Sequence, residues 1–153
     1  MRAGVMAAML MLAAPAAAES AVLTGRVMDI DTEFNTMVLV HQDPLGTTER
    51  WKLSWSDMSP VDHILDSAAV GFQLSVQAER TYFDTWDVRG VVSPPAAPDK
   101  VVVEVLKVNS STGQVAVRDP VTIENRTIVL EPYKLEGVRA GGHLTVDLRP
   151  VAP

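Results

Sequence analysis

The feature that most constrains the fold is a series of short runs in which apolar and polar residues alternate. A period of two residues is that of a β-strand with one buried face, and these runs are separated by Gly, Pro, Asp and Asn. The expected strands are residues 21–30, 37–41, 50–55, 72–78, 86–92, 101–108, 114–117, 127–130 and 143–148. One helical turn is expected at residues 60–67, with Ser59 as its cap and Pro60 at its first position. So many short strands with so little helix indicate an all-β barrel or sandwich.

The two halves of the chain resemble each other. Val27, Ile30, Asp31, Met37 and Leu39 stand in the same order and with the same spacing as Val105, Val108, Asn109, Val115 and Val117. Residues 71–76 likewise match residues 141–146. A tandem duplication of a small β-barrel unit explains both matches, and the alternative is a coincidence of two ordinary hairpins.

The duplication predicts two packed units, residues 19–93 and 99–153, joined by a proline-rich linker at residues 94–98. The second unit is expected to be shorter, and it either lacks a fifth strand or borrows an edge from the first. The expected core of the first unit is Val27, Ile30, Leu39, Leu53 and Leu74. The expected core of the second is Val105, Val108, Val117, Leu130 and Leu144.

Residues 1–18 have the pattern of a secretory signal. Arg2 is followed by an apolar run that ends in Ala16-Ala17-Ala18, and this order of a positive charge, an apolar stretch and small residues is typical of a cleaved signal peptide. The alternative is a membrane anchor, although the run is shorter than the roughly 20 residues that span a bilayer. We expect export to a bacterial periplasm and no membrane span in the mature chain.

Charge and composition exclude several classes of protein. The formal net charge of −6 disfavours nucleic-acid binding, which needs a basic surface. The chain has no Cys, so disulfides, thiolate metal sites and a Cys nucleophile are excluded. No catalytic or nucleotide-binding motif occurs, and we therefore expect a protein that is not an enzyme.

One segment resembles a known family. The first strand ends in Gly25-x-Val-x-x-Ile-Asp31, a second strand ends at His41, and Asp43-Pro44 and Trp51 follow. Over about residues 22–80 this pattern resembles the periplasmic copper/silver-efflux metallochaperones, which are small five-stranded OB-like barrels. The resemblance implies an OB-like barrel for the first unit. Together with the duplication, it predicts tandem OB-like barrels, with about five strands in the first unit and four in the second.

The resemblance also implies a candidate Cu(I) or Ag(I) site. In that family a His, two Met thioethers and a Trp ring bind Cu(I), because thioethers are soft ligands and the indole face attracts a cation. Here His41 matches the His with a one-residue shift, and Trp51 matches the Trp. Ser54 and Ser56 stand where the thioethers would be, and Met58 shares their strand face if the strand continues that far. A site of His41, Trp51 and Met58 would therefore have fewer thioether ligands than the family's site. The alternative is a relative of the family that binds no metal.

Three other clusters of residues have a structural explanation as well as a functional one. Trp51 and Trp55 share a strand face, as core residues or as an aromatic platform for a sugar or peptide. Asp29, Asp31 and Glu33 have calcium-loop spacing without its Gly and Glu, which favours turn charge. Asp62, His63 and Asp66 favour an exposed helix face over a hard-cation site.

The function expected from these patterns is that of a non-catalytic periplasmic binding or accessory module. Its barrel surface would be presented to an envelope protein, a peptide or an oligosaccharide. No cofactor is expected apart from copper, and weak Cu(I) or Ag(I) handling is the alternative function.

Overall fold

The computed structural model describes residues 19–81 and 84–148, so the expected signal segment lies outside the described residues. The strands of the described part are β1 (Ser20–Asp31), β2 (Thr36–Gln42), β3 (Thr48–Ser54), β4 (Gln73–Arg80), β5 (Thr85–Ala96), β6 (Lys100–Asn109), β7 (Gln114–Asp119), β8 (Glu124–Val129) and β9 (His143–Asp147). Its helices are α1 (Val61–Leu65) and a short 3-10 turn, η3 (Pro132–Lys134). The all-β prediction is confirmed, and each expected strand is present. None of the described helices is long and apolar enough to cross a membrane.

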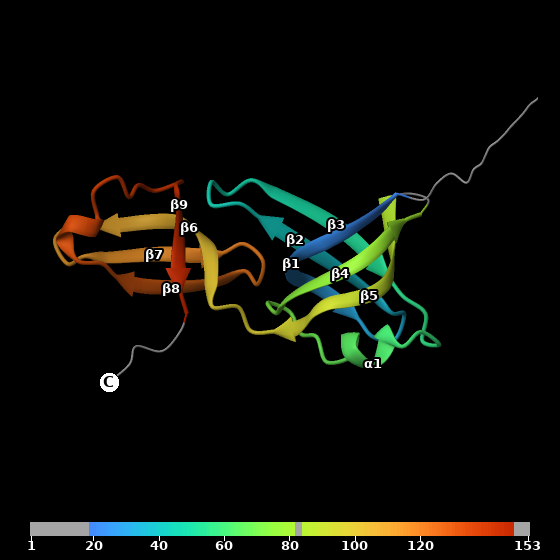
Figure 1. Ribbon diagram of the computed structural model, residues 1–153. Coiled ribbons are helices and arrows are strands. Elements are labelled where there is room, and N and C mark those ends of the chain that lie inside the picture. Colours follow the sequence, from blue (N-terminus) through green and yellow to red (C-terminus); the bar gives the residue numbers. More distant parts are fainter. Residues whose placement is uncertain (1–18, 82–83, 149–153) are drawn as a thin grey trace, which may run out of the picture.

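The first unit is a closed barrel with the strand order β1-β2-β3-β5-β4 in the described residues. Strands β3 and β5 are parallel, and α1 connects β3 to β4. This is the Greek-key arrangement of an OB-type barrel. Helix α1 begins at Val61, with Pro60 in the N-cap position, one residue later than the sequence predicts. Val61 and Leu65 turn inward and close the lower end of the barrel (Figure 1).

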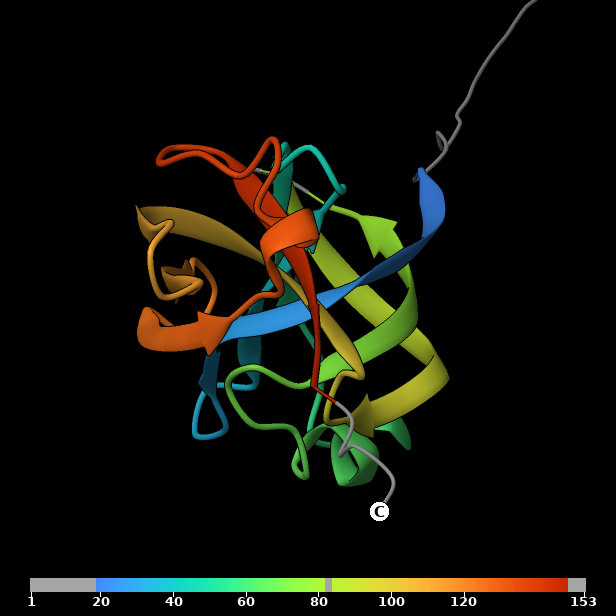
Figure 2. The same cartoon turned by 90° about the vertical axis from the view of Figure 1, so that its left-hand side faces the viewer.

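The second unit is a four-stranded sheet in the order β8-β7-β6-β9, as far as the described residues extend. The two units lie side by side, with the second at the left of Figure 1 and at the front of Figure 2. Strand β5 runs through Pro94 and Pro95 to Ala96, where its ladder with β4 is irregular. Part of the proline-rich segment is therefore strand, which the sequence did not predict.

Backbone geometry repeats between the units at equivalent positions. A bulge interrupts the β1–β2 ladder between Val27 and Asp29, and the β6–β7 ladder has the same bulge at the matching place, between Val105 and Lys107. The Asp31 carboxylate accepts hydrogen bonds from the amides two and three residues on, and the Asn109 amide oxygen does the same. Tandem duplication accounts for this agreement better than coincidence does, since bulges and side-chain-closed turns are specific features.

The expected core residues lie where the sequence placed them. Val27, Leu39, Leu53 and Leu74 are buried in the first core, and Ile30 packs against it half-buried. In the second unit Val105 and Val117 are buried. Val108, Leu130 and Leu144 pack against that core but stay partly exposed. The second core is thus the less complete of the two.

The units contact each other through two hairpin loops in a reciprocal way. The β2–β3 loop of the first unit brings Gly46 against the ring of His143, at the start of β9. The β7–β8 loop of the second unit brings Thr122 against Gly71, which precedes β4. Each unit therefore inserts the same hairpin against the fourth strand of the other, as in an approximately two-fold interface.

Gly46 is a test of this contact. Its φ is +87°, and a Cβ there would lie 2.5 Å from the His143 ring. We expect Gly46→Ala to lower the free energy of unfolding by about 2 kcal/mol, because it adds a clash to the strain of the left-handed backbone. Gly137→Ala is the matched control, since its φ is +83° and no atom lies within 4 Å of the added Cβ. Chemical denaturation of both variants measures the difference, and equal losses would contradict the contact.

Candidate functional site: the open side of the second unit

A cavity of about 220 Å³ opens on the interior of the second unit, next to the first unit. Strands β6, β7, β8 and β9 all contribute side chains to its walls. The second unit contributes the apolar residues Val101, Val103, Val117, Ile128, Val146 and Leu148 to its wall. Val70 and Phe72 of the first unit and Ala97 and Pro98 of the linker complete the apolar lining. The inner face of the sheet is thus accessible, whereas the interior of the first barrel is filled by its own side chains.

The cavity exists because no described strand occupies the place that β5 has in the first unit. Leu53, Leu74 and Val76 are 1%, 1% and 0% exposed, because β5 covers them with Trp86 and Val88. Strand registers make Ile128, Leu144 and Val146 their counterparts, and these three are only half-buried. The second unit therefore leaves apolar surface exposed at the positions where the first unit has a core.

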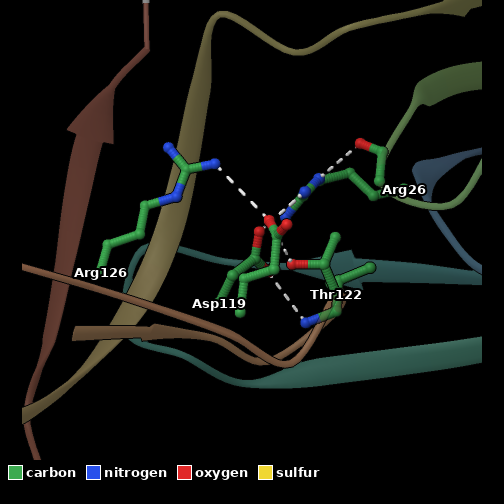
Figure 3. A network of polar contacts seen from close by, with 7 residues as sticks. Arg26, Asp119, Thr122 and Arg126 are labelled. Atoms are coloured by element: carbon green, nitrogen blue, oxygen red, sulfur yellow. Dashed lines mark hydrogen bonds and ion pairs between the residues drawn. The ribbon is translucent and has the colours of Figure 1, made fainter.

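A buried ion pair forms the inner end of the cavity and joins the two units (Figure 3). Arg26 of β1 donates two hydrogen bonds to the Asp119 carboxylate at the end of β7, with N···O distances of 3.0 and 2.9 Å. Both residues are buried. Arg26 Nε also donates to the Gly71 carbonyl at 3.1 Å, and Asp119 Oδ1 accepts from the Val121 amide at 2.9 Å. The pair is therefore bidentate and held from both sides.

The Asp119 carboxylate is ionised at neutral pH. Burial raises its pKa, but the hydrogen bonds from Arg26 and Val121 together with the guanidinium charge lower it by more, so the pKa lies below its usual value. A proton-transfer role at neutral pH is disfavoured for such a group, because a general acid or base needs a pKa near the working pH.

The outer part of the cavity carries a weaker polar pair. Arg126 and Glu124 lie on the inner face of β8, with 3.5 Å between their charged atoms, and the Thr122 hydroxyl donates to the same Glu124 oxygen. The Arg126 side chain is 53% exposed. Exposed ion pairs of this kind contribute at most about 1 kcal/mol to stability. Arg126 can therefore leave Glu124 for another acidic group at a small cost in free energy.

The structure brings together two of the three predicted metal ligands. His41 and Trp51 lie on the neighbouring strands β2 and β3, with 6.3 Å between their ring centroids. Met58 lies beyond the end of β3, whereas His41 pairs with Glu49 near the other end of that strand. The strand alone separates the two ends by about 16 Å. Among the described residues, no three His, Asp or Glu side chains are grouped to hold a metal ion.

The predicted aromatic platform is divided between core and surface. Trp55 is 5% exposed, and its indole N–H donates to Asp62 at 2.9 Å. It therefore cannot present its ring to a ligand, which corrects the prediction that Trp51 and Trp55 act together. Trp51 stays half-buried against the first core.

The remaining acidic clusters have structural roles or lie exposed. Asp62 accepts a hydrogen bond from Trp55, while His63 of α1 and Asp66, the C-cap residue of that helix, are exposed. Asp31 closes the β1–β2 turn by accepting the amides of Glu33 and Phe34. Solvated or turn-forming charge explains these residues without a bound cation.

Sequence reasoning missed Arg26 and Asp119. Arg26 follows Gly25 in a strand whose alternation places charges toward solvent, so nothing local indicates that its guanidinium is buried. Asp119-Pro120 repeats the Asp43-Pro44 dipeptide of the first unit, and that repetition is the signal that was available.

The ion pair can be tested against a control that the duplication provides. Asp43 and Asp119 both precede a Pro in a hairpin loop and accept backbone amides, but only Asp119 pairs with Arg26 in the described structure. We expect Asp119→Ala to cost about 3–5 kcal/mol of unfolding free energy, because it leaves a buried guanidinium unpaired. Asp43→Ala should cost about 1 kcal/mol, the loss of turn hydrogen bonds alone. Similar losses in denaturant titrations would mean that the pair contributes nothing beyond the turn.

Comparison of the chain with models of protein families finds no match, and comparisons with curated proteins and with solved structures find none either. The resemblance to copper/silver-efflux metallochaperones stays a prediction from residues 22–80.

Proposed function

We propose that this protein is an exported, non-catalytic binding module whose second unit receives part of a protein or peptide partner. The observation that carries the proposal is the half-buried apolar lining of the second unit, at positions where the first unit is sealed. Apolar surface that stays in contact with water contributes nothing to the stability of an isolated domain. Exposed apolar surfaces and apolar cavities of this kind mark interaction sites.

The polar groups of the cavity support binding rather than catalysis. Arg26 and Asp119 satisfy each other, and Glu124 is engaged by Arg126 and Thr122. The one hydroxyl–carboxylate contact among the described lining residues is that of Thr122 with Glu124, and the Glu124 oxygen that accepts it also faces the Arg126 guanidinium, a charge that weakens the carboxylate as a base. Export rests on the N-terminal pattern of a positive charge, an apolar run and small residues.

A peptide suits this cavity better than an oligosaccharide does. Sugar sites rely on exposed aromatic rings, whereas Phe72 is the one aromatic residue among the described lining residues and is half-buried, and Trp51 and Trp55 do not line the cavity. Copper handling has less support, because Met58, the expected thioether ligand, lies beyond the end of β3, whereas His41 pairs with Glu49 near the start of that strand.

Site-specific photo-crosslinking tests the proposal. A photoreactive residue placed at Ile128, on the cavity wall, should form protein adducts in a periplasmic extract. The same residue at Ile64, which is 37% exposed on α1, is the control and should form few. Equal adducts at both positions, or none at Ile128, would contradict the proposal. Turnover of an envelope substrate that is lost in Glu124→Gln would also contradict it.

A further inference from the structure

The second unit has two strands whose outer edges pair with no other strand of the described chain. Strand β8 pairs only with β7, and β9 pairs only with β6, within residues 19–81 and 84–148. In the first unit the corresponding strands, β3 and β4, both pair with β5. An unpaired edge is a template for an added strand.

Hydrogen bonds at the ends of the ladders show which backbone groups point outward. The Leu130 amide donates to the Gly113 carbonyl, and the Leu148 amide donates to the Asp99 carbonyl. In an antiparallel ladder every second residue of a strand bonds to the same neighbour, so every second amide counted back from Leu130 and Leu148 points to β7 or β6. Counting back along each strand, Thr127 of β8 and Thr145 of β9 direct their amides away from the sheet. Both amides face the side on which a fifth strand would lie.

We propose that the second unit binds an extended segment of a partner protein as its missing fifth strand, parallel to β8 and antiparallel to β9. This inference rests on the proposed binding function and specifies the partner's conformation. The first unit is its template, because β5 is parallel to β3 and antiparallel to β4. The other strand pairs have matching registers in the two units: β1–β2 corresponds to β6–β7, β1–β4 to β6–β9, and β2–β3 to β7–β8.

The template also specifies the apolar residues of the segment. Trp86 of β5 lies beside Leu53, and Val88 lies beside Ala78. In the second unit Ile128 is the counterpart of Leu53, and Leu148 is the counterpart of Ala78; both line the cavity. The segment therefore carries large apolar residues at alternate positions, so that one face enters the cavity and the other meets solvent.

Charge complementarity adds an acidic residue to this description. In the register of β3 and β5, Thr85 lies beside Lys52, so the preceding residue, Asp84, falls next to the place of Trp51. Arg126 is the counterpart of Trp51, and its half-exposed side chain makes a 3.5 Å contact with Glu124. An acidic residue two positions before the first apolar anchor would meet that guanidinium.

The probe for a binding experiment is a synthetic peptide with the sequence of residues 84–96 of this chain, which has the required acid and apolar spacing. We expect saturable binding to the purified protein by fluorescence anisotropy, and slower hydrogen exchange at the Thr127 and Thr145 amides on binding. A peptide with Trp86→Asp and Val88→Asp should not bind.

Proline substitutions separate strand addition from simple cavity binding. Thr127→Pro removes an amide that faces outward and is not needed by the β7–β8 ladder, whereas Thr127→Val keeps it. We expect the Pro variant to bind the peptide at least ten-fold more weakly than the Val variant. Thr145→Pro and Thr145→Val repeat the comparison on β9 should the first pair fail to fold.

The outcomes distinguish this inference from the proposed function. Crosslinking at Ile128 without peptide binding, or with equal binding by the Pro and Val variants, overturns strand addition and leaves the binding module standing. A stable dimer that excludes the peptide also overturns it, since a second copy would then fill the site. Peptide binding with protection of both amides supports it.

Discussion

The bidentate contact between Arg26 and Asp119 determines how the two units of this protein are arranged. It is buried, it joins residues 93 positions apart, and it is held on both sides by backbone hydrogen bonds. Removing such charges from water costs several kcal/mol per ion, so the contact is tolerated only where the geometry satisfies both groups. Its main consequence is the orientation of the units. A hairpin loop of each unit packs against the other unit, and the first unit bounds one end of the open side of the second.

Duplication then explains the asymmetry of the molecule. Both units use the same bulge, the same turn and the same strand registers. They differ in the strand that closes the barrel, because β5 covers the first core and no described strand covers the second. Trp86 and Val88 seal one interior, while Ile128, Leu144 and Val146 remain accessible in the other. The proposed binding function follows from this one difference between the described parts of the two units.

The sequence predicted the fold far better than it predicted the site. Alternation is a local pattern, and it located the strands and core residues such as Val27 and Val105 correctly. The site depends on contacts between residues distant in sequence, which alternation does not encode. Arg26 looks like a solvent-facing strand residue until the fold places Asp119 beside it. Met58 lies close to Trp51 in sequence and yet beyond the end of β3, whereas His41 pairs with Glu49 near the start of that extended strand.

The pH dependence of thermal unfolding tests most directly whether this ion pair couples the units. The pKa of Asp119 is lowered in the folded state, so its contribution is complete above the unfolded value of about 3.9 and is lost as pH falls through the folded value. Calorimetry should show one cooperative transition from pH 7 down to about pH 4, and two separate transitions only at lower pH. Two transitions at neutral pH, or a loss of coupling between about pH 5 and 7, would contradict the account.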